Sequence, residues 1–265
     1  MFGHDESNMI SIIMPSYNAS DFISDSINSV ILQTYKDWEL IIVDDCSEDN
    51  TVDIVKGFVS CDSRIKLILQ SENAGAAVAR NTALEICSGR YVAFLDSDDL
   101  WFPNKLQDQI DFMISTSSCF VFSAYEKIDE SGNKTGVVGV PEKVVYEDLL
   151  KTCVIGCLTV IYDTEVLGKV EMPLIRKRQD FGLWLNILKK TRYANGIQVP
   201  LAQYRVRKES ISYNKIQVSK FTWMLYRDVE KISLFKSIYY FSHYAVRGYL
   251  RNRFPSLSKI LGLMD

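Results

Sequence analysis

Short apolar runs alternate with stretches of helical periodicity through the first hundred residues, and this alternation restricts the fold more than any other feature. The runs predict buried strands at residues 10–14, 40–43, 65–69 and 91–95. Helices are expected between them, beginning after residues 20–21, after residues 49–50, and over residues 74–86. Strands joined by helices in this way form parallel sheets with right-handed crossovers. We therefore predict an α/β fold with a mostly parallel sheet and helices on both faces.

Polar residues follow the predicted strands at the points where the strands end. The clusters are Ser16-Tyr17-Asn18, Asp44-Asp45, Asn73 and Asp96-Ser97-Asp98-Asp99. In open parallel sheets, ligands bind in the crevice at the carboxyl ends of the strands. The sequence therefore predicts that four loops form one ligand site along a single edge of the sheet.

The last of these clusters places three carboxylates, from Asp96, Asp98 and Asp99, within four positions. Carboxylates that close together repel one another, and a divalent cation among them would relieve the repulsion. Hard cations prefer oxygen ligands and often share them with substrate phosphates. The alternative is an Asp-rich, solvated turn.

The pattern becomes mixed after Pro103, which is expected to open a helix. Strands are predicted at residues 120–126 and 158–162, a hairpin turn at 130–133, a helix at 179–188 and an extended segment at 199–206. We expect this half, residues 103–214, to be antiparallel or irregular and to cover the crevice.

The tail, residues 215–265, interleaves basic and aromatic side chains. An amphipathic helix of this kind can lie in an anionic membrane interface. The alternative is a helix pair that packs its aromatic residues on the main domain.

Composition excludes several other classes of protein. A net charge of −3 over 265 residues gives no basic face for nucleic acid. The six cysteines form no CxxC pair, so neither a zinc site nor a disulfide framework is expected. The amino-terminal residues are polar and acidic, unlike a signal peptide, and no apolar run reaches the roughly 20 residues of a spanning helix. We expect a cytoplasmic protein, either soluble or peripheral at the inner face of the cell membrane.

Six segments in this order resemble the nucleotide-sugar domain of the family-two inverting glycosyltransferases, which have the GT-A fold. They are MPSYN at 14–18, VDDCSEDNT at 43–51, NAGAAVARN at 73–81, DSDD at 96–99, QDFGLW at 179–184 and YRVRKESIS at 204–212. The resemblance spans about residues 9 to 212. It implies a Rossmann-like sheet in which residues 1–102 bind the nucleotide sugar and residues 103–214 form the acceptor-binding, catalytic half of the same domain.

The resemblance assigns the donor site to the first half of the chain. It implies that Asp45 contacts the uracil edge, that Asp44 shapes that pocket, and that Pro15 and Tyr17 line it; the alternative for Asp45 is a helix-capping or loop aspartate. Gly75 is expected to allow close backbone approach near the sugar, or to be a simple turn glycine. The remaining donor-site candidates are Asn18, Asn73, Arg80, Asp96 and Ser97. Arg80 is expected to pair with a phosphate or with one of the aspartates; the alternative is a surface salt bridge.

The resemblance also assigns the metal and the base. Asp98, with Asp96 or Asp99, would hold Mn²⁺ or Mg²⁺ against the diphosphate and act as a Lewis acid. Asp180 would be the catalytic base that deprotonates the acceptor hydroxyl. Many relatives carry Glu-Asp where this chain has Gln179-Asp180, so Asp180 is the sole carboxylate at that motif.

Aromatic and basic residues of the second half are expected to contact the substrates. Trp184 follows Asp180 by one helical turn, where it could stack on a sugar ring, with core packing as the alternative. Many family members carry histidine at the position of Arg207. Arginine binds phosphate bidentately, so we assign Arg205 and Arg207 to the donor or acceptor pyrophosphate. Arg178, in the basic run 176–178, would serve the same end, unless that run is only a solvated charged segment.

The resemblance implies a metal-dependent enzyme that transfers glucose or galactose from a UDP-sugar to an acceptor hydroxyl, giving a β-linkage. Within the family it is similar to bacterial O-antigen and capsule enzymes that build a β-1,3 linkage to GlcNAc-diphosphate-undecaprenol. Two alternatives stay open. One is the same chemistry on another acceptor, such as the lipopolysaccharide core or another glycan. The other is a non-catalytic module that binds a sugar nucleotide.

Overall fold

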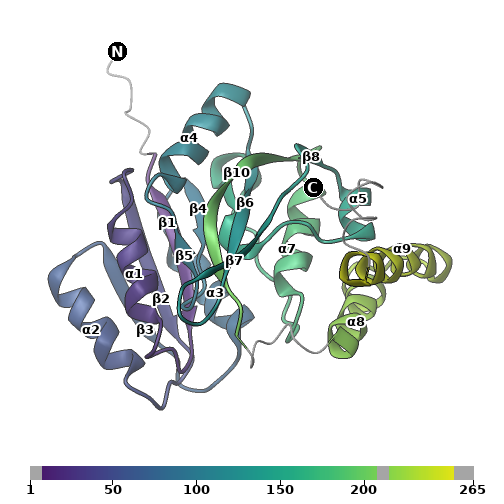
Figure 1. Ribbon diagram of the computed structural model, residues 1–265. Helices are drawn as coiled ribbons and strands as arrows, with labels where there is room; N and C mark the ends of the chain where they lie inside the picture. The colour runs from purple at the N-terminus through teal and green to yellow at the C-terminus, as the bar shows by residue number, and fades with distance from the viewer. Residues whose placement is uncertain (1–7, 208–214, 254–265) are drawn as a thin grey trace.

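The computed structural model describes residues 8–207 and 215–253, whose strands form one mixed sheet in the order β3-β2-β1-β4-β9-β6-β10-β5 (Figure 1). β7 pairs with β6 and β8 with β10. The strands are β1 Ile10–Ser16, β2 Trp38–Asp44, β3 Ile65–Leu69, β4 Tyr91–Phe94, β5 Leu100–Trp101, β6 Phe120–Ile128, β7 Lys134–Val138, β8 Lys143–Val144, β9 Ile161–Asp163 and β10 Ala194–Arg205. The helices are α1 Ile23–Ile31, α2 Thr51–Cys61, α3 Ala76–Ile86, α4 Lys105–Thr116, α5 Tyr146–Lys151, α6 Thr164–Leu167, α7 Gln179–Leu188, α8 Lys215–Met224 and α9 Leu234–Arg253, with a 3₁₀ turn at Cys157–Thr159 and a π-helical turn at Leu225–Val229.

The first half confirms the predicted α/β architecture. β3, β2, β1 and β4 are parallel neighbours, and their side chains are almost fully buried except in β3. Alternate residues of β1 face opposite layers: Ile12 packs in the same apolar cluster as Ile27 of α1, and Ile13 in the same cluster as Ala83 of α3. Helices therefore cover both faces of the sheet, and α7 belongs to the same layer as α3.

β1 continues two residues beyond its predicted end, through Pro15 to Ser16. Proline lacks a backbone N–H and is usually restricted to the edges of sheets. Here the pairing of β1 with β4 ends at Ile13, while its pairing with β2 continues. Pro15 therefore lies where β1 has already lost one neighbour, and the strand tolerates it.

The second half differs from the prediction in two strands. β6 and β10 run parallel to each other, whereas we expected an antiparallel or irregular half; β9, between β4 and β6, is antiparallel to both. The predicted strand at 158–162 is a 3₁₀ turn followed by the three residues of β9. β10 begins at Ala194, five residues before the predicted segment, because register shifts around Pro200 interrupt its apolar pattern. The hairpin turn at 130–133 is confirmed between β6 and β7.

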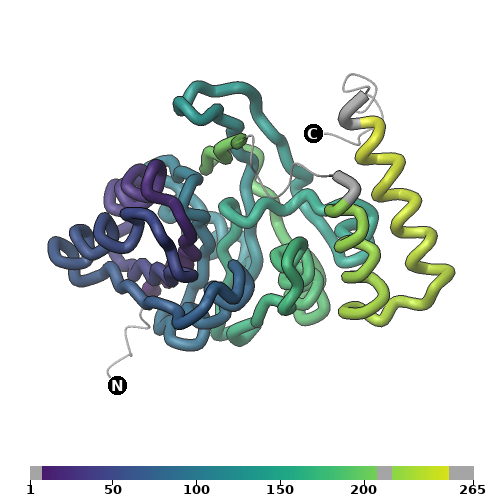
Figure 2. Tube along the Cα trace, turned by 90° about the horizontal axis from the view of Figure 1, so that it is seen from below, coloured from purple at the N-terminus to yellow at the C-terminus, as the bar shows by residue number. Residues whose placement is uncertain are grey.

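The described part of the tail packs on the main domain through its first half. Leu225 and Tyr226, after α8, are buried in the same core as α7, and the Tyr226 hydroxyl donates to the Leu150 carbonyl. Glu230 accepts hydrogen bonds from Tyr146 and Lys189. α8 and α9 lie side by side at the end of the molecule opposite α2 (Figure 2). None of the described helices is both long enough and apolar enough to cross a bilayer.

Candidate functional site

The loops after β1 and β2 are joined by hydrogen bonds between their polar residues. Asn18 has a positive φ of 46°; its N–H donates to the Ser47 hydroxyl at 2.9 Å, and its side-chain oxygen accepts the Glu48 N–H at 2.8 Å. The buried Asp44 carboxylate accepts the Ser16 hydroxyl at 3.0 Å and the Ser47 N–H at 2.8 Å. Asn18 and Asp44 thus hold the two loops together at the predicted edge of the sheet.

Asp45 joins the end of β2 to the start of α3. Its two carboxylate oxygens each accept one backbone N–H, from Ala74 and Gly75, both at 2.8 Å. Gly75 is the N-cap residue of α3 with φ +93°, a conformation that side chains rarely adopt. The helix-capping alternative for Asp45 and the turn role of Gly75 are therefore both present. Asp45 is only 4% exposed, and because a carboxylate has about four acceptor positions, its contact with a base stays a prediction.

Three other donor-site candidates stand around these loops. Pro15 is buried within β1, Tyr17 is 48% exposed at its end, and Asn73 is exposed ahead of α3. Tyr17 and Asn73 therefore present side chains to solvent at the edge where the parallel strands end. Their contact with a nucleotide remains a prediction.

Arg80 of α3 lies beneath the loop that follows β4. Its guanidinium forms an ion pair with Asp96, and its side chain is only 6% exposed, so the surface salt bridge that we weighed as an alternative is wrong. Burial is the largest single influence and lowers the pKa of Arg80, but the charge and hydrogen bond of Asp96, together with other nearby groups such as Asp180, outweigh it, and the pKa is raised. Arg80 is therefore a permanent buried cation that fixes the position of Asp96.

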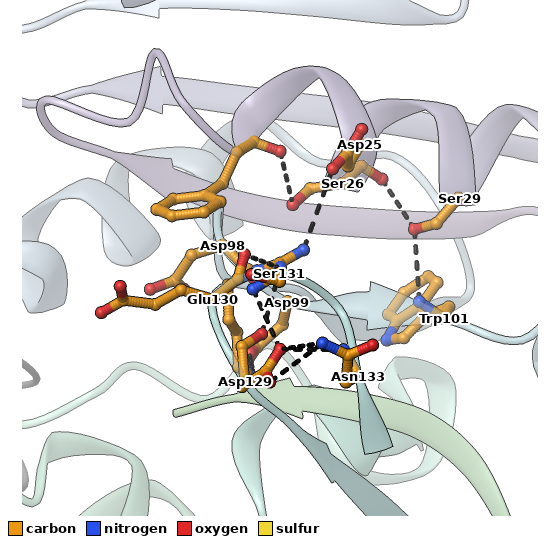
Figure 3. Close-up of polar contacts among 12 residues, drawn as sticks. Asp25, Ser26, Ser29, Asp98, Asp99, Trp101, Asp129, Glu130, Ser131 and Asn133 are labelled. Carbon is orange, nitrogen blue, oxygen red and sulfur yellow. Dashed lines mark hydrogen bonds and ion pairs between the residues drawn. The ribbon is translucent and has the colours of Figure 1, made fainter. Parts of the chain in front are cut away.

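Asp98 and Asp99 occupy different environments in the same loop (Figure 3). Asp98 is paired with Arg207 at 3.2 Å, and both side chains are about one-third exposed, 28% and 32%. Asp99 is 1% exposed and accepts the backbone N–H of Arg205 at 2.8 Å. Burial raises the pKa of Asp98, and the neighbouring carboxylate of Asp96 adds to this effect. The same two kinds of cause raise the pKa of Asp99 well above the ordinary value of an aspartate.

The Arg205 guanidinium is a structural bridge, in place of the pyrophosphate contact that we predicted. Its Nε donates to the Asp98 carbonyl at 2.9 Å and its Nη1 to the Glu130 carbonyl at 3.0 Å, while Asp25 of α1 lies 3.8 Å from its Nη2. The side chain is 3% exposed and packs over the ring of Phe22. Figure 3 shows Asp25, Asp98 and Glu130, from three separate elements, around this position. Arg207, beside Asp98, remains the candidate phosphate ligand.

Because Arg205 is buried and Arg207 is partly exposed, replacing each with alanine should affect stability to a different extent. Arg205→Ala should lower the free energy of unfolding by about 2–3 kcal/mol, because buried carbonyl groups lose their donor. Arg207→Ala should cost less than about 1 kcal/mol, as expected for a partly exposed ion pair, and should weaken UDP binding. Urea denaturation and UDP titration of both variants would check this. Equal losses of stability in the two variants would contradict the assignment.

The carboxylates fit a divalent cation only in part. Within residues 8–207 and 215–253, no three His, Cys, Asp or Glu side chains are placed to hold one metal ion. The predicted ligand role of Asp99 is wrong, because that carboxylate is buried and bonded to Arg205. Asp96 and Asp98 are both partly exposed and lie close enough for Asp96 to raise the pKa of Asp98. One or two carboxylates with substrate phosphates are the usual protein ligands of Mg²⁺, so this pair fits such an ion.

Asp180 lies in the first turn of α7, on the same side of the sheet as Arg80. The charges of Asp96 and Asp180 both act to raise the pKa of Arg80. Burial raises the pKa of the Cys157 thiol well above its ordinary value; Arg80 opposes this, and Asp96 and Asp180 add to it. Charges affect one another's pKa values appreciably only at short range. These mutual effects therefore indicate that four parts of the chain lie close together: the loop after β4, α3, the 3₁₀ turn and the start of α7. Cys157 marks this meeting point, and no motif in the sequence had indicated it.

The carboxylate of Asp180 has no hydrogen-bond or ion-pair partner among the residues that the structure describes. An aspartate that only capped its helix would accept a backbone N–H, as Asp163 does from Glu165 at the start of α6. Asp180 is thus close to the Asp96–Arg80 pair and keeps its acceptor capacity for another group. This is what a general base requires.

Trp184 differs from what we expected, whereas the phosphate role of Arg178 stays a prediction. Trp184 is fully buried and packs on Phe94 and Phe120, so core packing, the alternative, is correct and the ring has no face for a sugar. Arg178 is the N-cap residue of α7 with φ +67°, and its guanidinium donates to the Tyr244 hydroxyl of α9 at 2.7 Å. The run 176–178 is therefore more than a solvated charged segment. Residues 208–212 of the last motif lie outside the described residues.

Comparisons with known proteins identify the family that this chain resembles. The model of the family described as Glycosyl transferase family 2 matches residues 11–161. The Bacillus subtilis glycosyltransferase TuaG, named for teichuronic acid biosynthesis, is 47% identical over 238 residues, covering 89% of this chain and 94% of its own length. The Escherichia coli UDP-Glc:α-D-GlcNAc-diphosphoundecaprenol β-1,3-glucosyltransferase WfgD is 44% identical over 250 residues, covering 93% and 96%.

Solved structures share the fold. TarS of S. aureus, residues 1–349 in complex with UDP-GlcNAc, superposes with a TM-score of 0.68 at 21% identity, over 94% of this chain and 75% of that one. A mannosyltransferase from Pyrobaculum calidifontis, in complex with GDP-Man and Mn²⁺, gives a TM-score of 0.66 at 16% identity, over 96% and 79%. At these identities the likeness establishes the GT-A fold.

Proposed function

The chain belongs to glycosyl transferase family 2 and is a glycosyltransferase, and on that basis we propose that it transfers glucose or galactose from a UDP-sugar to an acceptor hydroxyl, with inversion. The observation that carries the proposal is the pair of ion pairs in the loop after β4, Arg80–Asp96 and Arg207–Asp98, with Asp180 near enough to affect the pKa of Arg80. We assign donor binding to residues 1–102 together with Arg207, and acceptor binding to the rest of residues 103–214.

The donor site uses the ends of the parallel strands. Asp45 and Tyr17 would bind the nucleotide, and Arg207, with one-third of its side chain exposed, would bind phosphate oxygens. Asp98 and Asp96 are the residues that would hold Mn²⁺ or Mg²⁺. When bound, such an ion neutralises charge on the departing diphosphate. Arg80 fixes Asp96 from below, and Arg205 fixes the backbone of Asp98.

The transfer step follows from the position of Asp180. Its carboxylate would accept the proton of the acceptor hydroxyl as the hydroxyl oxygen attacks the anomeric carbon. The bond between that carbon and the diphosphate oxygen breaks, and its electron pair leaves with UDP. Attack from the side opposite the leaving group inverts the configuration, so an α-linked UDP-sugar gives a β-linked product.

The acceptor that we propose is a GlcNAc-diphosphate-lipid of polysaccharide assembly. The support is the acceptor named for WfgD, at 44% identity over nearly the whole of both chains. A lipopolysaccharide core or another glycan is the alternative acceptor; the name of TuaG, for teichuronic acid biosynthesis, gives a polymer but no acceptor.

A donor and acceptor screen tests the proposal. Purified protein with Mn²⁺ or Mg²⁺ would be incubated with UDP-Glc or UDP-Gal and a synthetic GlcNAc-diphosphate-lipid. We expect a β-linked disaccharide product from one of the donors, identified by its anomeric NMR signals. Transfer to free glycans alone would favour the alternative acceptor. Donor binding with no transfer to any acceptor would favour a non-catalytic module.

A membrane contact through α9 belongs to the same proposal. Five apolar side chains along one stripe of this helix are about half exposed or more; they are Phe235, Ile238, Tyr239, Val246 and Tyr249. Their spacing of 3, 4, 11 and 14 residues from the first one places them on one face. Exposed Lys236 stands beside them. Such a face suits the interface of an anionic bilayer, and the inner face of the cell membrane is where we place the protein.

The vesicle affinity of α9 variants tests this contact. Phe235→Glu combined with Tyr239→Glu should weaken binding to phosphatidylglycerol vesicles at least about tenfold, because two aromatic side chains leave the apolar interface. Leu32→Glu is the matched control: Leu32 is equally exposed but lies beside α1. Sedimentation with vesicles would measure both. Unchanged binding of the α9 variant, or an equal loss in the control, would contradict membrane contact.

A further inference from the structure

A cavity of about 430 Å³ lies between the segment before α7 and the helix α8. Its lining residues are Arg176, Lys177, Gln217, Lys220, Phe221 and Met224. Three of these residues are cations and none is acidic, although most of the surface that they give to the cavity is apolar. The two remaining large side chains are apolar, and Met224 packs against the main core. Cationic side chains beside a mostly apolar surface suit a ligand that has both an anionic and an apolar part.

The positive charge of this cavity is only partly compensated. Lys177 donates to Gln217 at 2.8 Å, which joins the segment before α7 to α8. For Arg176 and Lys220, both exposed, the structure gives no carboxylate partner within its described ranges. An anion that bound here would therefore meet cations that do not first have to break an ion pair.

The cavity is also close, along the chain, to the proposed base. Arg178 follows two of the lining residues, and its positive φ turns the chain into α7, whose first turn carries Asp180. The donor phosphates are assigned to Asp98 and Arg207, in the loops at the other end of the proposed site. Because Lys177 precedes Asp180 by three residues and the donor phosphates are assigned elsewhere, we assign an anionic group bound in the cavity to the acceptor.

We propose that this cavity binds the diphosphate and the first isoprenoid carbons of a lipid-linked acceptor. This inference rests on the proposed function. Arg176, Lys177 and Lys220 would pair with the phosphate oxygens, and Phe221 and Met224 would contact the hydrocarbon. In an acceptor of this class the diphosphate is attached to the sugar that carries the attacking hydroxyl, so binding here would hold that sugar near Asp180. Helix α8 is then a substrate-binding element of the tail.

The test is a titration with farnesyl diphosphate, a soluble prenyl diphosphate, in the presence of saturating UDP and Mg²⁺ so that the donor site is filled. Wild-type protein should bind the probe, and the double variant Arg176→Ala, Lys220→Ala should bind it at least about tenfold more weakly, since two charge-assisted hydrogen bonds are lost. Lys220→Arg should retain binding. Lys56→Ala, an exposed lysine of α2 outside the cavity, is the matched control and should leave the affinity unchanged.

Three outcomes would overturn the proposal. Equal affinity of wild type and the double variant would place the probe elsewhere. Displacement of the probe by UDP would place it in the donor site. Binding of inorganic pyrophosphate as tight as that of farnesyl diphosphate would mean an anion site without a lipid component. Failure of the proposed function has a different signature, because the probe would then bind as predicted while no hexose is transferred to a GlcNAc-diphosphate-lipid.

Discussion

Replacing Asp180 with asparagine should lower kcat by about 10²–10⁴-fold while the affinity for the UDP-sugar stays the same, the usual loss when a general base is removed. The carboxylate has no partner among the described residues, so the substitution removes a proton acceptor without breaking a structural contact. The amide of asparagine has nearly the same shape and accepts no proton at neutral pH. Transfer rates would be measured at saturating donor and acceptor, and donor affinity by titration.

A matched control for this variant is Asp53→Asn on α2. Asp53 is 80% exposed and lies in an exposed pair with Lys56, so the same chemical change there should leave both rate and affinity unaltered. An Asp180→Asn protein with the full rate would contradict the role of the base. A parallel fall in donor affinity would mean that Asp180 acts in donor binding.

Replacing Asp98 with alanine should abolish turnover and remove the dependence of UDP binding on a divalent cation. Asp98 is the carboxylate of its loop that combines solvent access with proximity to Asp96 and Arg207. The loss should be visible in binding as well as in rate: in wild type Mn²⁺ or Mg²⁺ should tighten UDP binding, and in the variant UDP should bind equally with and without the cation. Calorimetric titration of UDP at fixed cation concentrations would measure this.

Two further variants make the result interpretable. Asp111→Asn on α4, which lies far from the loop in the fold, is the control for removal of an exposed carboxylate. Asp99→Asn should reduce stability more than binding, because Asp99 is buried and accepts the Arg205 N–H. A wild-type UDP affinity that does not respond to cations would contradict the metal site. An Asp98→Ala protein that still responds would assign the site to other residues.

The sequence was sufficient to predict the parallel half of the fold. Each strand there is a continuous apolar run because both of its faces are buried, and the loop clusters had to meet since parallel strands end at one edge. Irregular strands were less predictable. Register shifts divide the pattern of β10, and the apolar residues 158–162 were divided between a 3₁₀ turn and β9 because burial alone does not distinguish the two.

Roles within the site were harder to predict than positions. Asp45, Asp99 and Arg205 lie in the loops and strand ends that the motifs indicated. Their hydrogen-bond partners, however, are distant in sequence: about 30 residues away for Asp45, 106 for Asp99, and 75 to 107 for Arg205. Those partners decide which side chains remain available to a ligand. Trp184 illustrates the same limit, since helical spacing put it on the side of Asp180 but could not show that Phe94 and Phe120 enclose it.

A crystal structure of the protein with UDP and Mn²⁺ would locate the donor, the cation and the proposed base together. We expect the uracil beside Asp45, the diphosphate and the cation at Asp98 and Asp96, and the Asp180 carboxylate facing the open side of the diphosphate, where the sugar would lie. UDP bound away from the ends of β1, β2 and β4, or an Asp180 side chain on a surface remote from the diphosphate, would contradict it.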